Sequence, residues 1–238
     1  MSKAASAISE TTTPAAGAGK APLPEPVTYS VSPDVVVLDQ QGGAQAESIG
    51  SLRTHLIATH IRNGRRALGI CSSDGESGSE FVAVNLAVSL AQAGIRTLLI
   101  DGNMRTPFVE TAIIPSRPVP NLRQLLTDET LSISDTIQAD VIPHLSVLYS
   151  GGPAADAQEL LNGARFKQVI DTCMRDHELT LILTPPTNRC ADARRIASVV
   201  RYVLIVARRD VSFVDDLSTL VTQLNGDGAM VIGSVMNV

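Results

Sequence analysis

Residues 72–80 have the composition of an anion-binding loop. The loop contains Gly75 and Gly78, and it lies between an apolar segment at residues 68–71 and a helical pattern that begins at Phe81. The backbone N–H groups of a glycine-containing turn, together with the N-terminus of the helix that follows, can bind a phosphate group. The first chemistry that the sequence suggests is therefore phosphate or nucleotide binding. A glycine-rich turn before a helix is also commonly a plain turn, and the loop alone leaves that alternative open.

The same loop lacks two side chains that a working nucleotide-binding P-loop needs. Ser79 stands where a lysine would contact the β- and γ-phosphates, and Glu80 stands where a serine or threonine would bind Mg²⁺. At an effective dielectric constant of 20, two unit charges about 4 Å apart interact by roughly 4 kcal/mol. The Glu80 carboxylate would therefore repel a phosphate, unless it bound a metal ion, and the missing lysine removes an attraction of similar size. The sequence predicts a vestigial phosphate site.

Alternating strand and helix patterns surround this loop. Continuous apolar segments are typical of strands buried on both faces, and their alternation with helices predicts an α/β fold with a doubly wound, mostly parallel sheet and helices on both faces. A further β-like run is expected at residues 35–38. The strands are expected at residues 67–71, 97–100, 145–149, 179–183, 202–206 and 230–235, and the helices at 44–62, 81–93, 157–162, 166–176 and 213–224.

The first 34 residues differ in composition from the rest of the chain. Ala, Pro, Gly, Ser and Thr make up 23 of them. Such a segment has too little apolar surface to offset the entropy lost on ordering. We therefore expect residues 1–34 to form a disordered Ala/Pro/Thr-rich arm and residues 35–238 to form one folded domain. The arm could dock on a partner or could be a solvated tail without a role.

The composition excludes several classes of function. The net charge is −5, only 3% of residues are aromatic and there is no Trp, whereas nucleic-acid binding needs a basic face or aromatic residues for base stacking. No apolar run approaches the roughly 18 residues that suggest a membrane span, and we expect a cytoplasmic protein. The spacing of Cys71, Cys173 and Cys190 matches no zinc site, so these residues are expected to be reduced thiols.

From about residue 47 onward, ordered motifs resemble the cytoplasmic domain of bacterial tyrosine kinases (BY-kinases), relatives of the MinD and ParA ATPases. Residues 98–107 read LLIDGNMRTP and are similar to the family motif LLIDADLRRP. Residues 151–166 are similar to its "aGp…pAELL…erF" segment, residues 179–186 to LVIIDTPP, and residues 235–237 to the VLN near the nucleotide base. The resemblance implies a P-loop NTPase-like fold. It also implies work with a membrane polysaccharide co-polymerase in making capsule and exopolysaccharide.

The sequence departs from this family at most of the charged groups that the resemblance assigns to phosphoryl transfer. Asp101 keeps the first acidic position, but Asn103 and Leu183 replace two further aspartates, in addition to the changes at Ser79 and Glu80. Phosphoryl transfer depends on positioned cations and charge stabilisation. We therefore expect no catalytic residue, no metal site and weak or lost binding of ATP and Mg²⁺. The predicted vestigial nucleotide site comprises Gly75, Gly78, Ser79, Glu80, Asp101, Asn103 and Asn237.

Two of these residues have a structural alternative. Asp101 could hold a metal-bound water, or it could cap the end of a strand and bond nearby backbone, because sites of this fold lie where strands end. Asn237 could contact a nucleotide base or could simply end a strand.

The family's E-x-x-R-x-x-R assembly motif is incomplete. Glu47 and Arg53 match it, but Gly50 replaces the middle arginine. The change removes a charge-assisted contact and places a glycine inside a helix, at a cost of about 1 kcal/mol. Glu47 and Arg53 remain candidates for self-association or partner contact, and the family's ring is expected to be lost or replaced by contacts with a different partner.

The remaining polar residues give weaker signals. Tyr29, in the predicted arm, is the candidate phosphoacceptor, whereas Tyr149 and Tyr202 lie at strand ends and are expected to be structural. The arginine pairs at residues 194–195 and 208–209 are expected on a solvated face. The four histidines form no catalytic triad or metal-binding pattern.

The favoured hypothesis is a non-catalytic regulatory or scaffolding component of extracellular polysaccharide synthesis and export, for example of a capsule or holdfast. Its expected partner is an inner-membrane co-polymerase or a related protein. One alternative is an active or nucleotide-sensing tyrosine autokinase. Another is a ParA/MinD-like positioning factor, which the acidic charge and the missing P-loop lysine disfavour.

Overall fold

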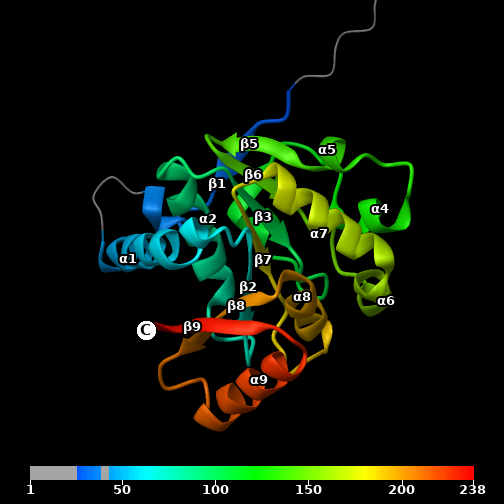
Figure 1. Ribbon diagram of the computed structural model, residues 1–238. Helices are drawn as coiled ribbons and strands as arrows, with labels where there is room; N and C mark the ends of the chain where they lie inside the picture. The colour runs from blue at the N-terminus through cyan, green and yellow to red at the C-terminus, as the bar shows by residue number, and fades with distance from the viewer. Residues whose placement is uncertain (1–25, 39–42) are drawn as a thin grey trace, which may run out of the picture.

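The computed structural model describes residues 26–38 and 43–238 (Figure 1). Within these residues, seven strands form one sheet in the order β5-β6-β3-β7-β2-β8-β9. Every neighbouring pair is parallel except β5–β6, so the predicted mostly parallel sheet is confirmed. The strands are β2 (Ala67–Ser72), β3 (Thr97–Asp101), β5 (Gln138–Ile142), β6 (Leu145–Leu148), β7 (Leu179–Leu183), β8 (Tyr202–Arg208) and β9 (Met230–Asn237).

Helices cover both faces of this sheet (Figure 1). Along β3, Leu99 belongs to the apolar cluster beneath α1 and α2, whereas Leu98 and Ile100 belong to the cluster beneath α7 and α8. This alternation is why a central parallel strand has an apolar residue at nearly every position. The helices are α1 (Ala44–Thr59), α2 (Ser79–Gln92), α3 (Val109–Ala112), α4 (Leu122–Thr127), α5 (Ile133–Thr136), α6 (Ala157–Asn162), α7 (Ala164–Asp176), α8 (Asp192–Val200) and α9 (Val214–Gly226).

The folded domain begins earlier than the predicted boundary. Strand β1 (Tyr29–Val31) pairs with β4 (Ile113–Pro115) in a separate antiparallel ladder. The Tyr29 hydroxyl donates a hydrogen bond to Gln138 Oε1 at 3.0 Å, and burial raises the pKa of Tyr29. Assigning residues up to 34, and Tyr29 with them, to a disordered arm is therefore wrong, because long-range pairing orders this segment. Residues 1–25 of the predicted arm lie outside the described residues.

Two strand predictions also need correction. Val36–Leu38 forms a 3₁₀ helix, where the sequence suggests a strand. Among the described strands, β9 pairs only with β8 and lies at the edge of the sheet, and Met230 and Met236 are 54% and 59% exposed. An apolar run indicates a strand, but it does not show whether helices cover both faces of that strand. The burial of β9 was therefore overpredicted.

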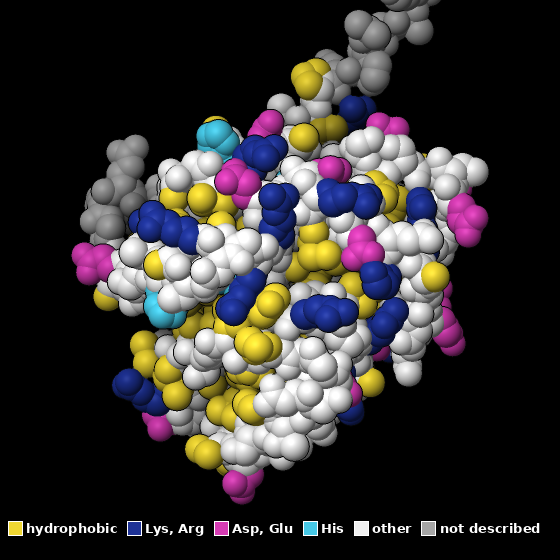
Figure 2. All heavy atoms as spheres, viewed as in Figure 1, with side chains coloured by type: hydrophobic (Ala, Val, Ile, Leu, Met, Phe, Trp, Pro, Cys, Tyr) yellow, Lys and Arg dark blue, Asp and Glu magenta, His cyan; other side chains and the backbone are white. Residues whose placement is uncertain are grey.

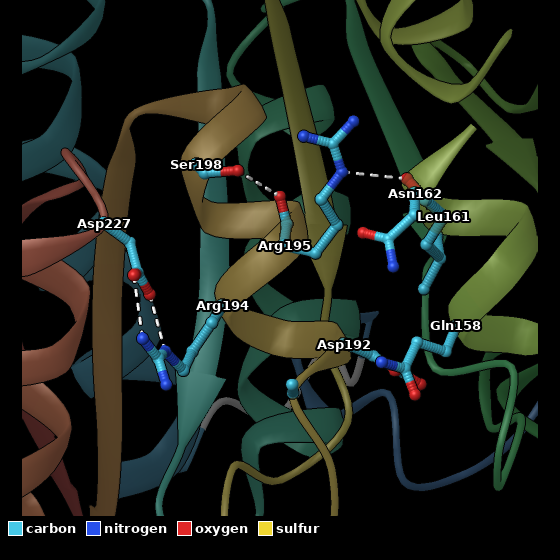
Figure 3. Close-up of a pocket in the computed structure, with 9 residues that line it drawn as sticks. Gln158, Leu161, Asn162, Asp192, Arg194, Arg195, Ser198 and Asp227 are labelled. Carbon is cyan, nitrogen blue, oxygen red and sulfur yellow. Dashed lines mark hydrogen bonds and ion pairs between the residues drawn. The ribbon is translucent and has the colours of Figure 1, made fainter. Parts of the chain in front are cut away.

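Helix α8 was not predicted, and its two arginines hold neighbouring elements in place. Arg194 forms a bidentate ion pair with Asp227, with its Nε 2.6 Å from Oδ2 and its Nη2 2.8 Å from Oδ1 (Figure 3). The Arg195 Nε donates to the Leu161 carbonyl at 3.0 Å (Figure 3). The predicted solvated role is therefore wrong for this pair, since both arginines join α8 to adjacent segments. Of the other pair, Arg208 is exposed but donates to the Glu76 carbonyl at 3.3 Å.

Candidate functional site

The carboxyl ends of β2, β3 and β7 meet at one edge of the sheet, because these strands are parallel neighbours. Leu183, the last residue of β7, is in register with Ile70 on one side and with Asp101 on the other. The loops that follow the three strands therefore converge at the place where an open α/β sheet binds its ligands. These loops contain most of the predicted site residues.

Internal hydrogen bonds shape the loop after β2. Asp74 Oδ1 accepts from the Glu76 N–H at 2.9 Å, and Asp74 Oδ2 accepts from the Ser212 hydroxyl at 2.7 Å. The Ser77 hydroxyl oxygen accepts from the Ser79 N–H at 3.3 Å. Two backbone N–H groups of the predicted phosphate loop are thus already bonded to side chains of the same loop. Neither Asp74 nor Ser212 was predicted from the sequence, where nothing connects two residues so far apart.

The two loop glycines allow other side chains to approach the backbone closely. Gly78 has φ +75°, and a Cβ there would overlap the amide of Asn237, whose Nδ2 donates to the Ser77 carbonyl at 3.1 Å. A Cβ at Gly75 would lie 3.1 Å from the terminal nitrogen Nη2 of Arg189. Asn237 therefore contacts the loop itself, and Arg189 brings a cation to it. Arg189 was missed because it follows the recognisable 179–186 motif and belongs to no motif of its own.

Asp101 is buried, and its carboxylate is hydrogen-bonded to backbone N–H groups. Its side chain accepts hydrogen bonds from the N–H groups of Asn103 (3.1 Å), Phe108 (2.8 Å) and Val109 (2.9 Å). Burial raises the pKa of Asp101 to about 6, the three N–H donors oppose that rise, and the nearby carboxylate of Glu80 adds to it. Of the two roles left open by the sequence, the geometry matches capping of the strand end and of the segment that leads into α3.

Asn103 and Leu183 do not offer metal ligands to the site. The Asn103 side chain closes its own turn, because its Oδ1 accepts from the Thr106 N–H and its Nδ2 donates to the Thr106 hydroxyl, both at 3.1 Å. Leu183 is fully buried in the apolar cluster on the α2 side of the sheet. An apolar side chain therefore occupies the position where the resemblance to BY-kinases implies an aspartate.

The first residues of α2 contribute negative charge. The Ser79 hydroxyl donates to Glu80 Oε2 at 3.2 Å and lies 3.4 Å from the Ser72 hydroxyl. The described residues contain no group of three or more His, Cys, Asp or Glu side chains that could hold a metal ion. With two neighbouring carboxylates, no lysine and part of the loop already bonded, this set of residues does not fit a nucleotide phosphate with Mg²⁺.

Glu47 and Arg53 lie on α1, outside this site. The Arg53 Nη1 donates to the Ser89 hydroxyl on α2 at 3.2 Å, whereas Glu47 is exposed. Together with Gly50 they lie on a nearly flat stretch of the outer face of α1. A Cβ at Gly50 would lie 3.9 Å from the Arg53 Nη2, an ordinary contact distance.

Comparisons with known proteins agree with this architecture. CapB of Staphylococcus aureus is 27% identical over 208 residues, which cover 87% of this chain and 90% of CapB. The tyrosine-protein kinase Wzc of Salmonella typhi is 28% identical over 191 residues, which cover 80% of this chain but 26% of Wzc. The crystal structure of the chimerical protein CapA2B2 has a TM-score of 0.76 and 26% identity, covering 87% of this chain and 90% of that one.

The homologues of this chain are bacterial tyrosine kinases. No family model matches the sequence. The fold also matches the septum site-determining protein MinD of Pyrococcus horikoshii, with a TM-score of 0.60 and 18% identity over 72% of this chain, which shows the fold alone. The chain spans about a quarter of the length of the longer kinases. Within the described part of the chain, no helix has the length and apolar character needed to cross a bilayer.

The proximity of Glu80 to Asp101 gives a pH-dependent prediction for this kinase homologue. A carboxyl whose pKa rises on folding, here from 3.8 to about 6, stabilises the fold most below about pH 4, and that contribution is lost as the pH rises through about 6. The substitution Glu80→Gln removes a like charge. It should lower the pKa of Asp101 and reduce this loss of stability.

Carboxyl ¹³C NMR titration of Asp101 would measure this shift directly, and urea unfolding between pH 4 and 7 would measure its effect on stability. Glu129→Gln, which changes an exposed carboxyl in another loop, is the matched control. An Asp101 pKa that is unchanged or raised in Glu80→Gln would contradict the electrostatic coupling.

Proposed function

We propose that this protein is a non-catalytic homologue of bacterial tyrosine kinases that regulates or scaffolds the synthesis and export of an extracellular polysaccharide, such as a capsule or holdfast. It acts by binding, at the cytoplasmic face of the inner membrane, a polysaccharide co-polymerase or a related protein. The family resemblance of the motifs and the similarity to CapB and Wzc support the pathway. The altered phosphate site supports the absence of phosphoryl transfer.

One observation carries the non-catalytic assignment. At the phosphate loop, Glu80 brings a carboxylate next to the buried Asp101, and Ser79 supplies no positive charge. Phosphoryl transfer needs positioned cations around the transferred group. The added negative charge and the lost positive charge both weaken the binding of the same phosphates. One neighbouring residue is therefore not expected to compensate for both changes.

Calorimetric titration of the purified protein with ATP and ADP, each with and without Mg²⁺, tests this proposal. We expect no binding heat up to millimolar nucleotide, and no phosphotyrosine by mass spectrometry after incubation with Mg-ATP. Mg²⁺-dependent binding, or phosphotyrosine on the purified protein, would overturn the assignment and favour an autokinase.

A second candidate, a non-catalytic nucleotide sensor, is favoured by the position of the Arg189 guanidinium beside Gly75. A guanidinium at this loop could partly replace the missing lysine as a phosphate ligand. A sensor would show a rise in Tm with ATP or ADP that does not require Mg²⁺ and that is lost in Arg189→Gln. The same titration therefore separates the sensor from the binding-only protein.

A further inference from the structure

We propose that a basic pocket at the opposite end of the sheet from the phosphate loop binds a ligand with a multiply charged phosphate group. The pocket has a volume of about 790 Å³, within the usual range for ligand sites. It opens where β2 and β8 begin, beside α7 and the C-terminal end of α8. Its charged lining consists of Arg65, Arg66, Lys167, Arg195, Arg201 and a single carboxylate, Asp171. Figure 2 shows Lys and Arg side chains gathered across the middle of the face that it presents, over α7 and α8.

In the part of the chain that the structure describes, the arginines of the pocket are not neutralised by ion pairs with carboxylates. Arg96, Arg105, Arg123 and Arg194 each pair with an Asp or Glu. Among the described residues, the four arginines of the pocket form no ion pair with a carboxylate, and Asp171 pairs with Lys167. The negative ends of α7 and α8 carry about half a charge each, which offsets only part of the remaining positive charge. In a chain with a net charge of −5, this concentration of cations favours an anionic ligand.

The Arg65 and Arg195 side chains are held in place by contacts that leave N–H groups available to a ligand. The Arg65 guanidinium carbon lies over the Tyr202 ring, 4.7 Å from its centre, a cation–π contact that holds the side chain at the pocket without using its N–H groups on a carboxylate. Arg195 uses its Nε on the Leu161 carbonyl, as Figure 3 shows, and its terminal nitrogens extend beyond that bond. Guanidinium groups match the oxygens of a phosphate in paired, planar contacts, which is why this set favours phosphate over a single carboxylate.

Arg201 is a second, independent indication. It caps α8 with φ +67°, in the left-handed region where glycine is the usual residue at this position. An arginine is strained in this conformation, and its exposed cation lines the pocket. Strain at a non-glycine position is often associated with a functional side chain.

The test uses the full chain, with sodium pyrophosphate as a soluble probe and vesicles that contain phosphatidic acid, whose phosphomonoester can carry two negative charges, as a lipid probe. Binding is measured by calorimetry for the first and by vesicle co-sedimentation against phosphatidylcholine for the second. The pocket variant is Arg66→Ser with Arg201→Gly, in which the glycine suits the left-handed cap and should preserve folding. The control, Arg62→Ser with Arg117→Ser, removes the same charge from exposed residues outside the pocket.

We expect at least one probe to bind and the pocket variant to lose at least tenfold in affinity, while the control changes less than twofold. Binding of pyrophosphate alone would identify a soluble phosphate ligand, and binding of the vesicles alone would identify a lipid headgroup. The proposal is overturned if neither probe binds, or if the control variant loses as much affinity as the pocket variant.

Discussion

Replacement of Asp101 with alanine is expected to lower the free energy of unfolding by about 3–6 kcal/mol. The carboxylate is 1% exposed and accepts hydrogen bonds from the N–H groups of Asn103, Phe108 and Val109. Each buried donor left without a partner costs about 1–3 kcal/mol, and the removal of a buried charge returns part of that cost. The expected loss of stability therefore reflects a structural role of Asp101 and no catalytic role.

Urea denaturation at pH 7, followed by circular dichroism, would measure this loss. Asp156→Ala is the control, because its carboxylate forms a partly exposed ion pair with Arg123 at 3.3 Å and should contribute less than about 1 kcal/mol. Asp101→Asn, which keeps one acceptor oxygen, should fall between the two. A loss below about 1 kcal/mol in Asp101→Ala would contradict the capping role.

The double substitution Ser79→Lys with Glu80→Thr is expected to increase the affinity for Mg-ATP by at least about 100-fold. It replaces a repulsion by an attraction at the same phosphates, each of roughly 4 kcal/mol at about 4 Å and an effective dielectric constant of 20. A gain of about 2.7 kcal/mol is enough for 100-fold, so even a third of the change at the two positions would suffice. Calorimetry with ATP and Mg²⁺ would measure the gain.

A matched control separates charge from shape. Ser79→Met with Glu80→Thr introduces a side chain of similar length to lysine without its charge, and it should bind much more weakly than the lysine variant. Equal affinities for the two variants, or no gain for either, would contradict the electrostatic explanation. The internal hydrogen bonds of Asp74 and Ser77 would then be the reason that the loop excludes phosphate.

The central strands could be predicted from the sequence because they are buried on both faces. The 67–71 and 179–183 segments became β2 and β7 almost without change, since every position in them is buried and most contribute to the apolar clusters on the two faces of the sheet. The short strands β1 and β5 were missed, because their polar and exposed residues carry no such pattern. Pairing partners distant in sequence determine these strands.

The candidate site was less predictable than the fold. The loop after β2 and the end of β3 were located by their motifs. The contacts of their side chains were not predicted. The contact of Arg189 with Gly75 and the hydrogen bond from Ser212 to Asp74 join loops that follow different strands. Neighbouring loops meet only after the sheet has formed, so local sequence patterns do not encode these contacts.

The bond between Asn237 and Ser77 joins residues 160 positions apart, and the bond from Ser212 to Asp74 spans 138. The loop after β2 therefore leaves the ribosome long before the residues that hold it have been made. Closing such long segments is entropically costly and slow relative to local structure. The loop gains its Asn237 bond only when β9 has paired with β8. The presence of this bond therefore indicates that the sheet has formed as far as β9. A chain whose synthesis stalls before β9 would lack the Asn237 contact.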